Sequence, residues 1–176
     1  MRAGLANLNR HINNLRENYG VPAVVSINQF VADTDAEVEL VMEHCKALGV
    51  QVALSTHWAN GGAGATDLAH MVAEICDADT TPANTPHNSF VYPGELSLWE
   101  KLEAVATKVY HASEITASTK VRDRLKELTD GGYGHLPVCI AKTPYSFSTD
   151  PLLKGAPDGH VTVSYTHLRA HETEAY

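Results

Sequence analysis

Two aromatic side chains follow two short apolar runs of the sequence, at the points where strands are expected to end. The run 23–27 leads into Phe30, and the run 50–55 leads into Trp58. In open α/β sheets, ligands bind beyond the carboxyl ends of the strands. Stacking of a flat heterocycle on one aromatic ring contributes roughly 1–3 kcal/mol. The pair therefore predicts a site for a flat ring, with ordinary core packing of both rings as the alternative.

The sequence contains no complete motif for binding a phosphate, for binding a metal ion or for a catalytic nucleophile. The glycine-rich stretch 60–64 precedes an expected helix, but no Gly-Lys-Ser/Thr follows it, so we expect a flexible turn there. No His-Glu-x-x-His, Cys-x-x-Cys or Gly-x-Ser-x-Gly motif occurs. The sequence thus predicts no metal site and no catalytic residue. We expect Asp33, Asp35 and Glu37 to serve a helix N-terminus.

Apolar periodicity in the first half predicts helices alternating with strands. A capping box, Thr34 with Glu37, marks one helix start, and Gly20, Pro22 and Gly49 mark helix ends. The expected order is a helix over 5–15, a strand over 23–27, a helix over 35–48, a strand over 50–55 and a helix over 68–75. This order is typical of an open parallel α/β sheet.

The second half repeats this alternation after a stretch rich in Pro, Thr, Asn and Asp. We expect a short strand over 90–92, a helix after Ser97, a strand near Ile115, a helix ending at Gly131 and a strand over 136–141. The expected organisation is a partial α/β domain at 1–80, a connector at 81–94 and a second partial α/β domain at 95–163. Residues 164–176 resemble translated sequencing-adapter peptides, so we expect a non-native tail there.

The overall charge of the chain indicates which classes of partner it can bind. The 13 Lys and Arg residues face 21 Asp and Glu residues, giving a formal net charge of -8. Such acidity argues against a nucleic-acid partner, because contacts to phosphates supply most of that affinity. No apolar run is long enough to span a membrane, and the first residues do not read as a secretory signal. We expect a cytoplasmic protein with Cys45, Cys76 and Cys139 as buried, reduced thiols.

A series of ordered motifs resembles the formate–tetrahydrofolate ligase family, also called formyltetrahydrofolate synthetase. The resemblance runs from about residue 4 to residue 163. The matching motifs are GLANLxRHI (4–12), VPxVVxINxF (21–30), DTDxE (33–37), WAxGG (58–62), GYGxLPVC (132–139), AKTxYSFS (141–148) and GAP (155–157).

The resemblance implies an ATP-dependent ligase of one-carbon metabolism. Family members join formate to tetrahydrofolate through formyl phosphate, giving 10-formyltetrahydrofolate, ADP and phosphate. The implied substrates are ATP with Mg²⁺, formate and tetrahydrofolate, with a monovalent cation as a further candidate. The implied fold is part of a parallel-sheet, P-loop-NTPase-like nucleotide- and folate-binding domain, followed by part of a second α/β domain. The implied assembly is a homotetramer.

The resemblance also assigns site residues. Positions matching Phe30 and Trp58 form the family's stacking site for the flat ring of the folate or nucleotide. Leu54 matches an apolar residue that lines the same pocket, and Asn28 matches a strand-end position that faces the nucleotide. The family usually has Pro after the Phe, where this chain has Val31.

One part of the family's catalytic machinery is missing from this sequence. The family carries a Gly-rich phosphate loop with a Lys, and its chains are some three times longer. We therefore expect a fragment of the ligase that is inactive alone. The alternative is a stand-alone folate- or nucleotide-binding module without catalysis.

Overall fold

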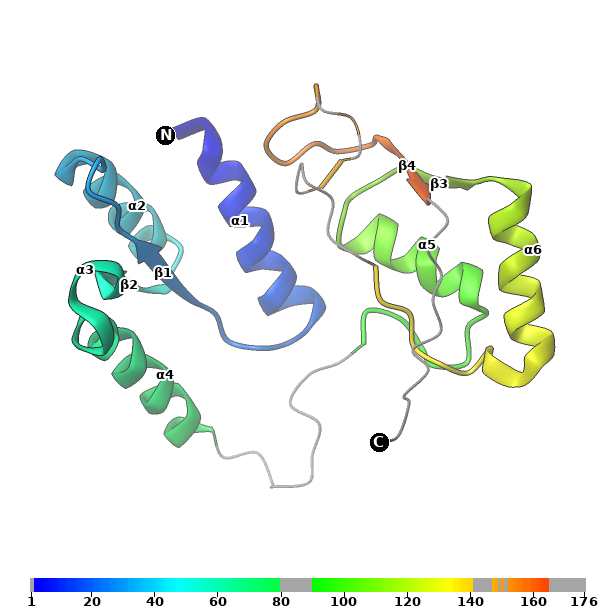
Figure 1. Ribbon diagram of the computed structural model, residues 1–176, viewed down its shortest axis with the longest axis horizontal. Helices are drawn as coiled ribbons and strands as arrows, with labels where there is room; N and C mark the ends of the chain where they lie inside the picture. The colour runs from blue at the N-terminus through cyan, green and yellow to red at the C-terminus, as the bar shows by residue number, and fades with distance from the viewer. Residues whose placement is uncertain (1, 80–89, 141–146, 149, 151, 165–176) are drawn as a thin grey trace. The chain divides into compact units, whose positions relative to one another are not determined.

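The computed structural model divides into two compact units, residues 1–89 and 90–176 (Figure 1). It describes residues 2–79, 90–140, 147–148, 150 and 152–164. Most of the loop 142–148 and nearly all of the expected tail 164–176 lie outside this described part. None of the described helices is long and apolar enough to cross a membrane.

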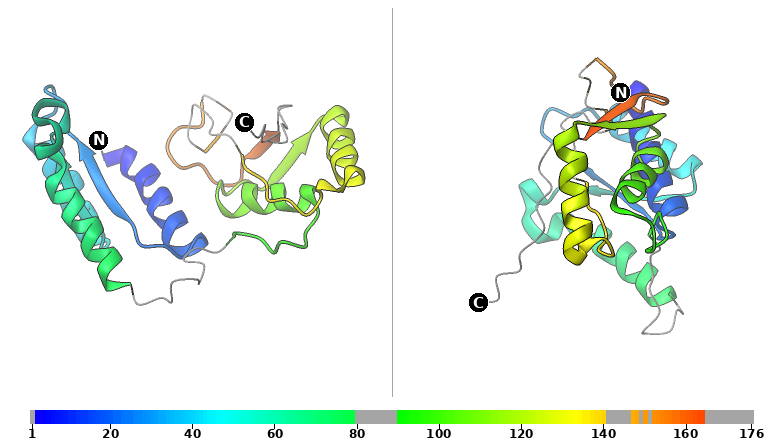
Figure 2. Two further views of the ribbon diagram at one scale, coloured as in Figure 1. Left: turned by 60° about the horizontal axis from the view of Figure 1, so that its bottom comes forward. Right: turned by 90° about the vertical axis from the view of Figure 1, so that its right-hand side faces the viewer.

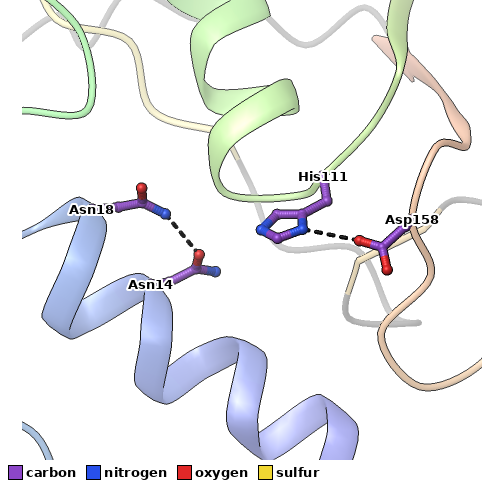
Figure 3. A network of polar contacts seen from close by, with 4 residues as sticks. All are labelled: Asn14, Asn18, His111 and Asp158. Atoms are coloured by element: carbon purple, nitrogen blue, oxygen red, sulfur yellow. Dashed lines mark hydrogen bonds and ion pairs between the residues drawn. The ribbon is translucent and has the colours of Figure 1, made fainter.

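The first unit alternates helices and strands as expected. Its elements are α1 (Leu5–Asn13), a π-helical turn (Asn14–Asn18), β1 (Val24–Asn28), α2 (Asp35–Ala47), β2 (Gln51–Ser55), α3 (His57–Asn60), a 3-10 turn (Gly61–Ala65) and α4 (Thr66–Ala78). Inside the π-helical turn, the Asn18 side-chain amide donates a hydrogen bond of 2.9 Å to Asn14 Oδ1 (Figure 3).

Strands β1 and β2 pair in parallel, with Val24 opposite Gln51 and Asn28 opposite Ser55. Helix α2 makes the crossover that a parallel pair requires. Helices α1 and α4 lie on opposite sides of β1 (Figures 1 and 2). The parallel α/β arrangement predicted for this part of the chain is confirmed.

The start of α2 is fixed by the predicted capping box. Thr34 Oγ1 accepts a hydrogen bond from the Glu37 amide, and the Glu37 carboxylate accepts one from the Thr34 amide. The bond from the Thr34 amide, together with one that the Thr34 hydroxyl donates to the same carboxylate, holds the pKa of Glu37 below its usual value, since both favour the charged form. The two amide bonds of the capping box also satisfy backbone donors at the helix start that would otherwise lack partners. The turn between β1 and α2 is thereby anchored on its helical side.

The second unit has its own core. Its elements are α5 (Leu98–Lys108), β3 (Glu114–Ala117), α6 (Thr119–Leu128), a π-helical turn (Thr129–Tyr133) and β4 (Val161–Ser164). The two helices and β3 enclose a buried cluster made of Leu98, Leu102, Ala106, Ala112, Ile115, Val121 and Leu125. The helix after Ser97 begins with the predicted capping box to Glu100.

Strand β4 was not predicted from the sequence. It pairs with β3 in parallel, so that Ile115 lies opposite Thr162. Just before the pairing, the Gly159 amide donates to the His111 carbonyl at 2.8 Å. His111 adopts the left-handed region, with φ of 54°, and its Nδ1 lies 2.9 Å from Asp158 Oδ1 (Figure 3). These contacts bring together segments that are far apart in the sequence.

Two of the strand predictions are wrong for the residues that the structure describes. Residues 90–92 form a bend, and residues 136–140 form no strand. The Tyr92 hydroxyl accepts a hydrogen bond from the Val138 amide at 2.9 Å and donates one to the Val138 carbonyl. A side chain thus satisfies the backbone groups that a neighbouring strand would use. Val138 and Ile140 pack against the buried cluster, which accounts for the apolar pattern.

The cysteines are free, but only one is buried. Cys45 on α2 is fully buried, and this burial raises the pKa of its thiol. Cys76 and Cys139 are exposed, so the prediction of three buried thiols is wrong. Helix α4, which carries Cys76, has no buried residue.

Candidate functional site

A pocket of about 320 Å³ opens at the carboxyl ends of β1 and β2. Its two walls come from the segments that follow these strands. The lining residues are Gln29, Phe30, Val31, Asp33, Thr56, Trp58, Ala59 and Asn60. Phe30 is 56% exposed and Trp58 is 71% exposed. Both side chains therefore line the pocket and are largely exposed to solvent, which contradicts ordinary core packing of these two residues within the described part of the chain.

The wall beyond β1 is a tight turn. The Asp33 amide donates to the Phe30 carbonyl at 3.0 Å, and the Phe30 amide donates to Asp33 Oδ2 at 2.8 Å. Asp33 therefore fixes the backbone that carries the Phe30 ring. Val31 occupies the second position of the turn and is 89% exposed. Among the described non-glycine residues only His111 has a positive φ, so Val31 and Ala32 are compatible with a type I turn.

Val31→Pro is expected to stabilise the first unit by about 0.4–1 kcal/mol. Proline is favoured at the second position of a type I turn and restricts the unfolded chain. Urea unfolding followed by Trp58 fluorescence, in a Trp99→Phe background, measures the change. Ala32→Pro is the matched control and is expected to destabilise, since proline is disfavoured at the third position. Destabilisation by Val31→Pro would contradict the turn geometry.

The wall beyond β2 is built around Thr56. The Thr56 amide donates to the Gly64 carbonyl at 2.9 Å, and the Asn60 side-chain amide donates to Thr56 Oγ1 at 3.0 Å. A Cβ added at Gly64 would lie 2.5 Å from the Thr56 carbonyl carbon and 2.6 Å from the His57 nitrogen. The expected flexible glycine turn is thus a 3-10 turn held closely against the end of β2.

The other two predicted site residues lie beside the pocket. Leu54 on β2 is half-buried, and Asn28 at the end of β1 is exposed; neither contributes to the lining. Their roles in ligand binding stay predictions. The structure adds Gln29, Asp33, Thr56 and Asn60, which sequence reasoning did not select. Their signal was their position within a few residues of the two strand ends.

The pocket is acidic rather than basic. Among the described residues that line it, Asp33 is the one ionisable residue, and Gln29, Thr56 and Asn60 supply neutral polar groups. None of these described lining residues is Lys, Arg or His. The arrangement can stack a flat ring and accept or donate hydrogen bonds at the ring edge. The described lining side chains include no cationic group for a phosphate.

A second pocket, of about 220 Å³, lies between α5 and α6 in the second unit. Trp99 lines it, and the Arg122 guanidinium lies 4.2 Å from the centre of the Trp99 ring. One face of that ring is therefore already covered. In the described part of the chain, no group of three or more His, Cys, Asp or Glu side chains is placed to hold a metal ion.

The paired parallel strands and the pocket beyond their carboxyl ends define an α/β protein with a pocket at the sheet edge, where ligands bind in open α/β sheets. The model of the family described as formate–tetrahydrofolate ligase matches residues 1–172. The chain belongs to this family. The match extends over most of the segment 164–176, whose origin stays a prediction.

Several curated relatives carry the name formate–tetrahydrofolate ligase. The protein of Granulibacter bethesdensis is 51% identical over 92% of this chain, and that of Methylococcus capsulatus is 51% identical over 96%. The protein of Pelagibacter ubique is 48% identical over 91%. The alignments cover 27%, 29% and 28% of these relatives, respectively. The chain thus spans less than a third of the length of the relatives it matches.

Proposed function

We propose that this chain forms the ring-binding pocket of a formate–tetrahydrofolate ligase, an enzyme of one-carbon metabolism that acts in the cytoplasm. The reaction joins formate to tetrahydrofolate with ATP, through formyl phosphate, and yields 10-formyltetrahydrofolate, ADP and phosphate. The observation that carries the proposal is the pocket that Phe30 and Trp58 share beyond β1 and β2. Neither residue stacks on another aromatic ring in the described part of the chain. A flat ligand ring can therefore use both.

We propose finer assignments as well, which the family membership supports. In this proposal Leu54 and Asn28, which lie beside the pocket lining on β2 and at the end of β1, contact the bound ligand. We extend the fold to a P-loop-NTPase-like domain over residues 1–80, joined by residues 81–94 to a second α/β domain over 95–163. ATP with Mg²⁺, a monovalent cation and assembly as a homotetramer belong to the same proposal.

We propose further that the chain alone does not catalyse ligation. Transfer of a phosphoryl group requires cationic groups or backbone amides that stabilise its charge. The sequence holds no Gly-Lys-Ser/Thr motif, and the charged group among the described lining residues of the pocket is a carboxylate. We expect no ADP formation that depends on both formate and tetrahydrofolate. A stand-alone binding module predicts the same ligand binding, so the binding test below serves both hypotheses.

Trp58→Ala is expected to weaken tetrahydrofolate binding by roughly tenfold or more, because one stacking face is lost. Isothermal titration calorimetry of the full chain measures the change. Trp58→Phe is the matched control and should retain most of the affinity, since an aromatic face remains. Equal affinities of the chain and of Trp58→Ala, or no binding to the unmodified chain, would contradict the proposal.

A further inference from the structure

The described residues that line the pocket between Phe30 and Trp58 include one charged group, and its position suggests how the ligand ring is selected. Asp33 lines the pocket from the turn that carries Phe30. The remaining polar lining residues are neutral amides and a hydroxyl group. A single carboxylate in a stacking pocket favours a ring edge that donates hydrogen bonds and disfavours an edge that accepts them.

We propose that Asp33 determines ring specificity by accepting N–H groups from a 2-amino-4-oxo-pyrimidine edge, as found in pterins. This inference rests on the proposed function and narrows its ligand from a folate or nucleotide ring to the pterin ring. It assigns to Asp33 a binding role in addition to its hydrogen bond to the Phe30 backbone.

The Asp33 carboxylate keeps hydrogen-bond acceptor positions that a ligand can occupy. Asp33 Oδ2 accepts the Phe30 amide at 2.8 Å. A carboxylate has two oxygens with about four acceptor positions in total. Oδ1 and the second lone pair of Oδ2 are therefore left for a ligand. Because the Phe30 amide holds one oxygen, the carboxylate is preorganised beside the ring-stacking surface.

The hydrogen-bonding groups at the ring edge distinguish a pterin from an adenine ligand. A pterin presents its ring N–H and its 2-amino group side by side, and a carboxylate can accept from both with charge assistance. Adenine presents acceptor nitrogens beside its amino group, and the lone pairs of these nitrogens would repel the carboxylate oxygens. On the opposite wall, Thr56 Oγ1 already accepts from Asn60, so its hydroxyl hydrogen is free to donate to a ring acceptor.

Asp33→Asn tests the specificity role without removing the turn. The Asn side-chain oxygen can still accept the Phe30 amide, while the other position becomes an N–H donor. Lumazine is the matched probe, because it differs from pterin by a 2-oxo acceptor in place of the 2-amino donor. We measure the affinities of pterin, lumazine and adenine for the full chain and for Asp33→Asn by nuclear magnetic resonance titration. Asp35→Asn, an acidic position in the first turn of α2 outside the pocket lining, is the control.

The chain is expected to prefer pterin over lumazine by roughly tenfold or more, because a site that pairs with a donor rejects an analogue that lacks it. Asp33→Asn should reverse the preference, and Asp35→Asn should leave it unchanged. An unchanged pterin-to-lumazine ratio in Asp33→Asn, with tetrahydrofolate still bound, would overturn the role of Asp33 alone. Absence of tetrahydrofolate binding to the unmodified chain would overturn the proposed function and this inference together.

Discussion

Gly64→Ala is expected to destabilise the first unit by about 1–3 kcal/mol and to weaken ligand binding in the Trp58 pocket. The added Cβ would lie 2.5–2.6 Å from backbone atoms of Thr56 and His57, where no flexible side chain can give way. Overpacking of this kind typically costs about 1–3 kcal/mol. The forced shift acts on the segment that carries Thr56 and Trp58. Urea unfolding followed by Trp58 fluorescence, with Trp99 replaced by Phe, measures the stability change.

Gly62→Ala is the matched control, two residues earlier in the same 3-10 turn. A Cβ at Gly62 meets nothing within 4 Å, and its φ lies outside the left-handed region. This substitution should be neutral or stabilise by about 0.4–1 kcal/mol, because alanine restricts the unfolded chain. Equal effects of the two substitutions would contradict the close approach of the turn to the end of β2.

Lys101→Met is expected to destabilise the second unit by about 2–4 kcal/mol. Lys101 on α5 is fully buried, and its Nζ donates to the carbonyls of Gly134 and Leu136 at 3.0 and 3.1 Å. Methionine fills similar space but leaves both carbonyls without their donor. A buried polar group that loses its partner costs about 1–3 kcal/mol. Urea unfolding followed by Trp99 fluorescence, in a Trp58→Phe background, measures this change.

Lys120→Met is the control for Lys101→Met. Lys120 lies exposed in the first turn of α6, so its replacement should change the unfolding free energy by no more than about 0.5 kcal/mol. If Lys101→Met were as mild as Lys120→Met, the Lys101 hydrogen bonds would not contribute to stability as the structure indicates.

Local signals in the sequence were enough to predict most elements. The capping boxes at Thr34 and Ser97 depend on residues three positions apart, and both are present. The runs that became β1 and β2 are short, rich in β-branched or apolar residues and bounded by turn residues. Non-local pairing was not predictable in this way. Strand β4 depends on contacts with β3. Residues 136–140 form no strand because the Tyr92 hydroxyl hydrogen-bonds to the backbone of Val138.

In the candidate site, too, some residues could be predicted from local sequence signals and others could not. Phe30 and Trp58 were predicted because each follows a strand, and parallel pairing brings the strand ends together. Asp33 was assigned to a helix N-terminus, since acidic residues are common there. In the structure its carboxylate instead binds the Phe30 amide and lines the pocket. The direction of that side chain depends on the turn, which residue types alone do not reveal.

The most direct test of the ring-binding pocket is a titration of the isotope-labelled chain with tetrahydrofolate, followed residue by residue with amide chemical shifts. We expect saturable shifts that concentrate on residues 29–33 and 56–60, with the Trp58 indole N–H among them. Shifts confined to the pocket beside Trp99 and Arg122, or no saturable shifts, would contradict it.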